Sequence, residues 1–264
     1  MKSRQTFLVA IFIVFFLLSL KAQTDTVMYQ SPQTADSTGV KMNIIKLNLT
    51  SLMVKNISVQ YERVINKFLS VTFSVRYMPN TTVPYLNFAY NKFGNDDPAT
   101  SDAIQGAKMT NFSFSPEVRF YVGKKGYGRG FYVAPAYRYT QYKISNLDYV
   151  YANYPSLDST ISFSGSLNAH FGGVLLGAQW LLGKHLTLDW WFFGPLIGIE
   201  KSTINVVSSV PLSEDDQNDL RQNLEGLDIP HTQKTVMVNE HGGSLNMKGL
   251  MAGMSFGLAL GVRF

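Results

Sequence analysis

The chain has 264 residues, of which 16% are charged and none is cysteine. The charged fraction lies below the roughly 25% that is usual for soluble proteins, and the lack of cysteine excludes disulfides, thiol catalysis, a lipoprotein anchor and cysteine-based zinc sites. Without residues 1–22, which have the features of a cleaved leader, 20 basic residues face 18 acidic ones. The mature chain is therefore nearly neutral, and no basic patch argues for nucleic acid as a partner.

The N-terminal segment has the pattern of a secretory signal peptide. Lys2 and Arg4 precede an apolar run over residues 7–20, and cleavage is expected near Ala22. A retained membrane anchor is the alternative, but the run is shorter than the ~17 to 25 residues that a spanning helix needs. The polar residues 23–41 that follow show no period, and we expect a periplasmic tail there.

From Met42 onward, large apolar side chains alternate with small, polar or charged ones, which indicates β-strands with two different faces. The expected strands cover residues 42–50, 57–62, 69–77, 112–121, 131–140, 174–182, 186–193 and 250–264. In the seventh strand every second residue from Leu186 to Phe192 belongs to the apolar outward row. Phe193 falls on the opposite, inward face with Asp189. Pro116 and Pro135 would each forfeit a ladder hydrogen bond, so we expect β-bulges there.

The last strand shows most clearly which face points outward. Leu258, Leu260 and Val262 share one face, whereas Gly257 and the other residues opposite them are small until the strand ends at Arg263. Bulk on the outside and a narrow polar interior is the arrangement of a barrel whose solvent is lipid. The terminal Phe264 resembles the signal that outer-membrane barrels present to their insertion machinery.

The connections between the strands alternate between short turns and extended segments. The extended segments are residues 79–109, 145–160 and 203–246, and all three fall on the extracellular side if the N-terminus is periplasmic. We therefore predict an all-β fold over residues 42–264, an eight-stranded antiparallel up-and-down transmembrane β-barrel. It would lie in the bacterial outer membrane with both termini in the periplasm.

Three segments carry a resemblance to a known family: IIKLNLTSLMVKNISVQYERVINKFLSVTFSVRYMP, GGVLLGAQWLLGKHLTLD and GLALGVRF. They resemble an uncharacterised family of eight-stranded outer-membrane barrels found in Bacteroidota, with the small-barrel architecture of OmpA and OmpX. The resemblance covers nearly all of the mature chain. It implies a location and a fold, but no ligand and no reaction.

Eight charged side chains are expected to point into the barrel. They are Lys46, Glu62, Arg76, Glu117, Arg119, Arg138, Asp189 and Arg263. An eight-stranded barrel is just wide enough for side chains to fill it, and buried charges favour mutual pairing. We predict a structural polar plug. The alternative is an ion or proton path, which needs a water column that long arginine side chains would block.

The lipid A deacylase family, whose members are outer-membrane barrels with a serine nucleophile, is a precedent for catalysis in such a fold. The residues to consider are His170, His241, Ser164, Ser166 and Ser244. The His-x-Ser arrangement that such enzymes carry on one strand is absent, since Phe171 and Gly172 follow His170. A catalytic histidine would also need a serine within hydrogen-bond reach and an orienting carboxylate. We predict that the protein is not an enzyme.

Two further segments have alternative interpretations. The glycine-rich residues 123–130 lack the strand-to-helix context of a phosphate loop, so they predict a tight periplasmic turn, with contacts to lipid phosphates or peptidoglycan as the alternative. Ser213, the acidic residues 214–216 and the apolar Leu220 and Leu224 predict an N-capped amphipathic helix. Asp215, Asp216 and Asp219 lack EF-hand spacing, which favours a solvated acidic face over a calcium site.

These features predict a structural or surface-interaction protein of the outer membrane. A small-solute channel is the first alternative, and a lipid-modifying enzyme is the second. We expect no cofactor and no metal. The expected partners are outer-membrane lipid and lipopolysaccharide, the barrel insertion machinery and an extracellular ligand of the loops, but not nucleic acid.

Overall fold

The computed structural model describes residues 41–86, 106–151, 159–227 and 229–264. The expected signal peptide (1–22) and, apart from Lys41, the expected tail (23–41) lie outside the described residues. Neither helix in the described part of the chain is long and apolar enough to cross a membrane.

The described residues form one sheet of eleven strands and two helices. The strands are β1 (Asn43–Asn48), β2 (Ile57–Val64), β3 (Leu69–Thr82), β4 (Lys108–Val122), β5 (Gly130–Tyr151), β6 (Ser159–Leu182), β7 (Leu186–Phe193), β8 (Pro195–Ser208), β9 (Thr232–Asn239), β10 (Gly242–Met254) and β11 (Gly257–Arg263). The helices are α2 (Leu49–Leu52) and α5 (Glu214–Gly226). Every strand pairing is antiparallel.

Eight of the described strands close a barrel. The order β1, β2, β3, β4, β5, β6, β7, β11 returns to its start, because β5 pairs with β6 and β11 pairs with β1. This confirms the predicted all-β, eight-stranded antiparallel barrel. The end of the barrel at Asn43 and Phe264 is called the basal end below. These two residues close the sheet there, since each backbone N–H donates to the carbonyl of the other.

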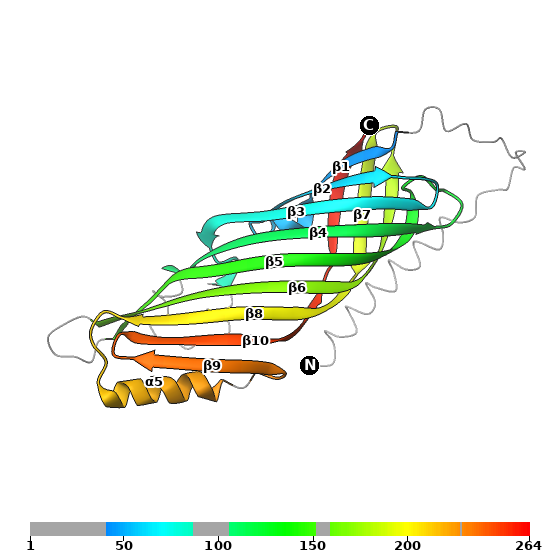
Figure 1. Ribbon diagram of the computed structural model, residues 1–264. Coiled ribbons are helices and arrows are strands. Elements are labelled where there is room, and N and C mark those ends of the chain that lie inside the picture. Colours follow the sequence, from blue (N-terminus) through cyan, green and yellow to red (C-terminus); the bar gives the residue numbers. More distant parts are fainter. Residues whose placement is uncertain (1–40, 87–105, 152–158, 228) are drawn as a thin grey trace, which may run out of the picture. The chain divides into compact units, whose positions relative to one another are not determined.

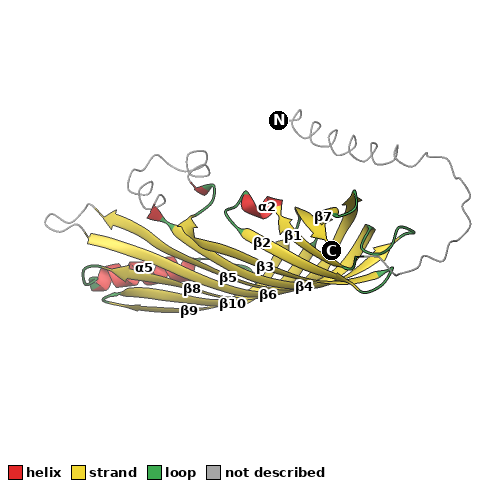
Figure 2. Cartoon of the chain, turned by 90° about the horizontal axis from the view of Figure 1, so that it is seen from above, coloured by secondary structure: helices red, strands yellow, loops and turns green. Residues whose placement is uncertain are grey.

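The sheet continues beyond the barrel at the opposite end (Figures 1 and 2). β6 pairs with β7 near the basal end and with β8 from Gly173 to Ile161, and β8, β10 and β9 then follow in order. We call β8, β9, β10 and α5 the distal extension. Two expectations are therefore wrong. Residues 203–246 were expected to be a loop but include long paired strands. Residues 145–160 were also expected to be a loop, but the described ones among them continue β5 and β6.

Helix α5 packs on the distal extension. Leu220 and Leu224 contact a small apolar cluster that includes Leu245 and Met247 of β10. At the other end of the helix, Lys234 of β9 donates to the carbonyls of Glu225 and Leu227, as cations at helix C-termini do. The predicted helix and its N-cap are confirmed.

Replacing Ser213 by alanine is expected to lower the stability of helix α5 by about 1 kcal/mol. The Ser213 hydroxyl accepts from the Asp216 N–H at 3.2 Å, and the Ser213 N–H donates to the Asp216 carboxylate at 3.3 Å. Hydrogen exchange of the α5 amides should become about fivefold faster. The exposed Gln222→Ala is the control, and equal rates in both variants would contradict the capping role.

The outer surface of the barrel is apolar over its whole girth. Alternate side chains of each barrel strand point outward and are exposed, for example Ile45 (48%), Phe73 (46%), Trp190 (41%) and Leu260 (41%). Their neighbours along each strand point inward and are buried, as the alternation predicted. This pattern, bulky and apolar outside with charge inside, is that of an outer-membrane-type barrel.

Four local expectations are wrong. The expected last strand, residues 250–264, is broken after Met254 into the end of β10 and the separate strand β11. Phe193 was expected to point inward, but a shift of register between β6 and β7 at Leu176/Gly177 turns it outward, where it is 45% exposed. Pro116 and Pro135 produce no bulge. The register of β4 with β3 and β5 is the same on both sides of Pro116, and the register of β5 with β4 and β6 is the same on both sides of Pro135. The first strand ends at Asn48, where the Asn48 side chain caps α2.

Candidate functional site

The barrel interior contains a cluster of five buried charged side chains near the basal end. They are Lys46 of β1, Glu62 of β2, Glu117 and Arg119 of β4, and Asp189 of β7. Lys46 Nζ lies 2.5 Å from Glu62 and 2.6 Å from Asp189. Arg119 lies 2.6 Å from Asp189 and 2.9 Å from Glu117. We call these five residues the ion cluster.

The register of the strands explains why these residues meet. Thr72 pairs with Glu62 on one side and with Glu117 on the other, so the three point inward at one level. Arg119 lies one inward position nearer the basal end on β4 and reaches across the interior to Asp189. Arg119 is also the largest of the fully buried side chains. The barrel therefore brings two cations and three carboxylates into contact.

Polar side chains that the sequence analysis did not single out complete the ion cluster. Tyr121 donates to Glu62 at 2.7 Å, and Tyr132 donates to Asp189 at 2.9 Å while its ring lies 4.4 Å from the Arg119 guanidinium. Gln179 accepts from Lys46. All three occupy inward positions of the alternating pattern, and this is the signal that would have found them. Buried charges with this many partners are held in fixed positions.

The glycine-rich turn 123–130 folds against the basal end of the cluster. Gly126 and Gly128 have φ of 60° and 72°, and a Cβ on Gly128 would clash with Val64. The Gly128 carbonyl accepts from the buried Gln179 amide at 2.7 Å. The predicted turn is confirmed, and glycine is needed because of both the backbone conformation and the close approach.

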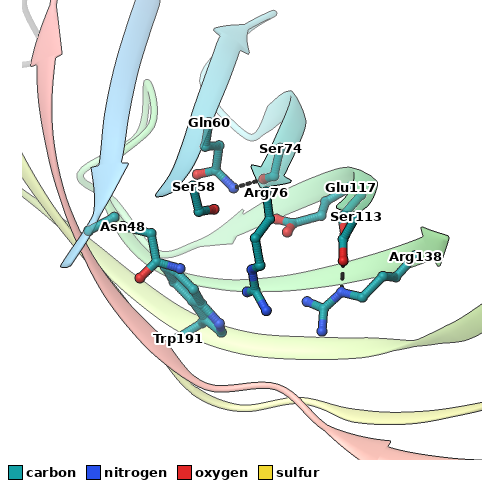
Figure 3. Close-up of a pocket in the computed structure, with 11 residues that line it drawn as sticks. Asn48, Ser58, Gln60, Ser74, Arg76, Ser113, Glu117, Arg138 and Trp191 are labelled. Atoms are coloured by element: carbon teal, nitrogen blue, oxygen red, sulfur yellow. Dashed lines mark hydrogen bonds between the residues drawn. The ribbon is translucent and has the colours of Figure 1, made fainter. Parts of the chain in front are cut away.

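A small polar cavity lies next to the ion cluster on the side away from the basal end. Its lining includes Arg76 of β3, Glu117 of β4 and Arg138 of β5, together with Asn48 and Trp191 (Figure 3). Arg138 donates to the hydroxyls of Ser115 and Ser255 at 3.1 and 3.0 Å. We call it the arginine cavity. The structure thus places Arg76 and Arg138 outside the ion-cluster contacts.

Arg263 lies at the basal end and donates to the Lys41 carbonyl. Phe264 follows it, points outward and is 51% exposed. Its role as an insertion signal stays a prediction.

One part of the interior is apolar. Buried aromatic and aliphatic side chains of the strands β4 to β8 and of β11 pack together there, among them Phe171, Leu175, Trp191 and Leu196. The interior was expected to be narrow and polar. It is divided instead between this apolar wall and the ion cluster that lies against it, and Tyr121 and Tyr132 belong to both.

The histidines and serines considered for catalysis are dispersed. His170 Nδ1 lies 2.7 Å from the Tyr137 hydroxyl, and His241 lies 3.4 Å from Glu240. Ser164 and Ser166 line a separate cavity of about 330 Å³, whereas Ser244 pairs with Met237 and Asn205 in the sheet. Within the described ranges, no side-chain hydrogen bond joins a histidine to a serine, and no group of three acidic or histidine side chains has the geometry to hold a metal.

Comparisons with known proteins place the chain in a family without an assigned function. No curated protein matches it. The crystal structure of the outer membrane protease OmpT from Escherichia coli is similar at 8% identity and a TM-score of 0.25, over 86% of this chain and 94% of that chain. This likeness is too low to bear on fold or function. A model of the family described as protein of unknown function (DUF3575) matches residues 11–193, which is more than half of the chain, and the protein therefore belongs to the DUF3575 family.

Proposed function

We propose that the protein is a non-catalytic barrel of the bacterial outer membrane, with a plugged interior and a structural or surface-interaction role. The observation that carries this proposal is the ion cluster. Lys46, Arg119 and Asp189 meet across the interior from different sides of the barrel wall, and the turn 123–130 is fastened to them through Gln179. Side chains in direct contact leave little room for a water column in a barrel of this width.

The proposed location rests on the outer surface. A girdle of exposed apolar side chains around a closed barrel is stable in lipid. Closure also pairs the backbone N–H and C=O groups of neighbouring barrel strands with each other. The basal end, with its short turns, would face the periplasm and would hold both ends of the barrel sequence. Outer-membrane lipid and lipopolysaccharide would surround the wall, and the insertion machinery would recognise the strand that ends at Phe264.

The distal extension is the part that we propose for surface interactions. β8, β9 and β10 continue past the barrel, and α5 packs on them through its own small core. An element with its own core offers a stable surface outside the membrane to an extracellular ligand. Its acidic residues Asp215, Asp216 and Asp219 would then form a solvated face of the extension.

The purified protein in a planar lipid bilayer is expected to give no sustained conductance, because the ion cluster and the turn 123–130 fill the interior. The measurement is the single-channel current at voltages of both signs. A gel shift on boiling, which folded barrels show, would serve as the control that the inserted protein is intact. Large, stable, ion-selective currents would contradict the plug and favour the alternative of a small-solute channel.

A further inference from the structure

The arginine cavity holds more positive charge than the described residues neutralise. Arg76 and Arg138 both point into it (Figure 3), and Glu117 is the one carboxylate among its lining residues. Glu117 already accepts from Arg119 at 2.9 Å and from Thr72 at 3.1 Å. Among the described residues, neither Arg76 nor Arg138 forms a salt bridge. Two guanidinium groups with free donors favour an oxyanion, which they hold with charge-assisted hydrogen bonds.

The size of the cavity limits what enters it. Its volume of about 20 Å³ corresponds to about one or two water-sized groups. One or two oxygens of a phosphate fit such a space, whereas a whole sugar or peptide does not. Asn48, Ser58 and Ser74 line the cavity as further polar groups. An anion that uses this site would therefore insert only a small charged end, and the rest of the molecule would lie elsewhere.

The cavity lies where the pairing between the first and last barrel strands ends. Asn48 and Ala259 are the final pair of the β1–β11 ladder, and both line the cavity. On the same edge of the sheet, β10 pairs with β9 only as far as Gly249. Between Gly249 and Ala259, residues 251–257 have no strand partner on this edge among the described residues. The strand β1 cannot supply a partner there, because the chain leaves β1 at Asn48 and enters the helix α2.

The surroundings of this unpaired edge are apolar. Met53, which follows α2, is 68% exposed, and on the opposite side Met254 and Phe256 are 57% and 68% exposed. Leu52 of α2 is exposed as well. Apolar side chains on both sides of a charged cavity match a molecule that has an acyl chain and an anionic headgroup.

We propose that the arginine cavity binds the phosphate headgroup of a membrane lipid, which enters through the unpaired edge at residues 251–257. Arg76 and Arg138 would hold the phosphate oxygens, and the acyl chains would lie against Met53, Met254 and Phe256. The proposal rests on the membrane location under the proposed function, but it does not depend on the plug.

The test measures lipid binding to the purified, folded protein in zwitterionic detergent by native mass spectrometry. The probes are phosphatidic acid, phosphatidylcholine and inorganic phosphate. We expect one phosphatidic acid to bind per barrel, more tightly than either of the other probes. Arg76→Gln and Arg138→Gln should each weaken it at least about tenfold, since each change removes charge-assisted hydrogen bonds to the phosphate. Arg76→Lys, which keeps the charge but loses the planar fork, should weaken it less.

Arg63→Gln is the matched control, because Arg63 is exposed on β2 and donates to Asn43 rather than lining the cavity. Binding should stay within about twofold of the wild type there. Equal loss in the control, or undiminished binding in the Arg76/Arg138 double variant, would overturn the site. If inorganic phosphate bound as tightly as phosphatidic acid, the site would bind free phosphate, and the proposal of a lipid ligand would be wrong. Failure to insert into vesicles would overturn the membrane location and this proposal together, whereas insertion without lipid preference would overturn this proposal alone.

Discussion

Replacing Arg119 by methionine is expected to lower the free energy of unfolding by about 3–5 kcal/mol, because the change leaves buried carboxylates without their main partner. Glu117 would then lose its ion-pair partner, and Glu62 and Asp189 would share Lys46 alone. Methionine keeps most of the side-chain volume, so the effect reports charge more than packing. The measurement is urea-induced unfolding from lipid vesicles, followed by the shift of the folded band on gels.

A second variant separates charge balance from general damage. Adding Asp189→Asn to Arg119→Met removes one of the unbalanced carboxylates, and part of the lost stability should return. The control is Arg63→Met, an exposed arginine outside the ion cluster, which should change stability by no more than about 0.5 kcal/mol. If Arg119→Met and Arg63→Met had equal effects, the ion cluster would not stabilise the barrel.

The faces of the strands were predictable from the sequence alone, because lipid on one side and a narrow interior on the other impose opposite demands on successive residues. Lys46, Glu62 and Asp189 were assigned to the interior on this ground, and the structure places them there. The orientation of Phe193 was predicted wrongly, because a single register shift reverses the direction in which the following side chains of the strand point. Nothing in the local sequence marks where such a shift occurs.

The division of the eight charges into separate groups was not predictable. Alternation tells which residues point inward, but the register tells at which level they lie. Thr72 pairs with Glu117, so Arg76, two inward positions further along β3, lies above the ion cluster instead of within it. Ala136 pairs with Glu117, and Arg138 is one inward position further along β5, so it also lies above the ion cluster. Register depends on turn geometry and on the shear of the whole barrel.

Residues 203–246 of the distal extension were expected to form a loop, because the strands there lack the contrast between faces that lipid imposes. In β9, Val236 and Val238 pack toward α5, whereas the opposite face mixes Thr235 with the exposed Met237. The helix α5 was predictable, because a capping serine and apolar residues at helical spacing are local signals. The pairing of β9 with β10 is decided by tertiary contacts, which local signals do not contain.

Replacing Leu260 by arginine is expected to reduce the stability of the folded barrel in lipid vesicles by about 2–4 kcal/mol, the cost of arginine near the middle of a bilayer. Leu260 is 41% exposed on the outer face. It pairs with Leu47 on one side and with Leu188 on the other, so an arginine there has apolar neighbours on both adjoining strands. The folded fraction would be measured by gel shift after titration with urea.

The control for Leu260→Arg is Asn223→Arg, which adds the same side chain to an exposed position of α5 in the distal extension. That change should leave the stability of the barrel within about 0.5 kcal/mol of the wild type, because the new charge stays in water. The contrast between the two variants isolates the transfer of arginine into lipid from the effect of added charge. Equal effects would mean that Leu260 does not face lipid, and the proposed location in the outer membrane would then lose its main physical argument.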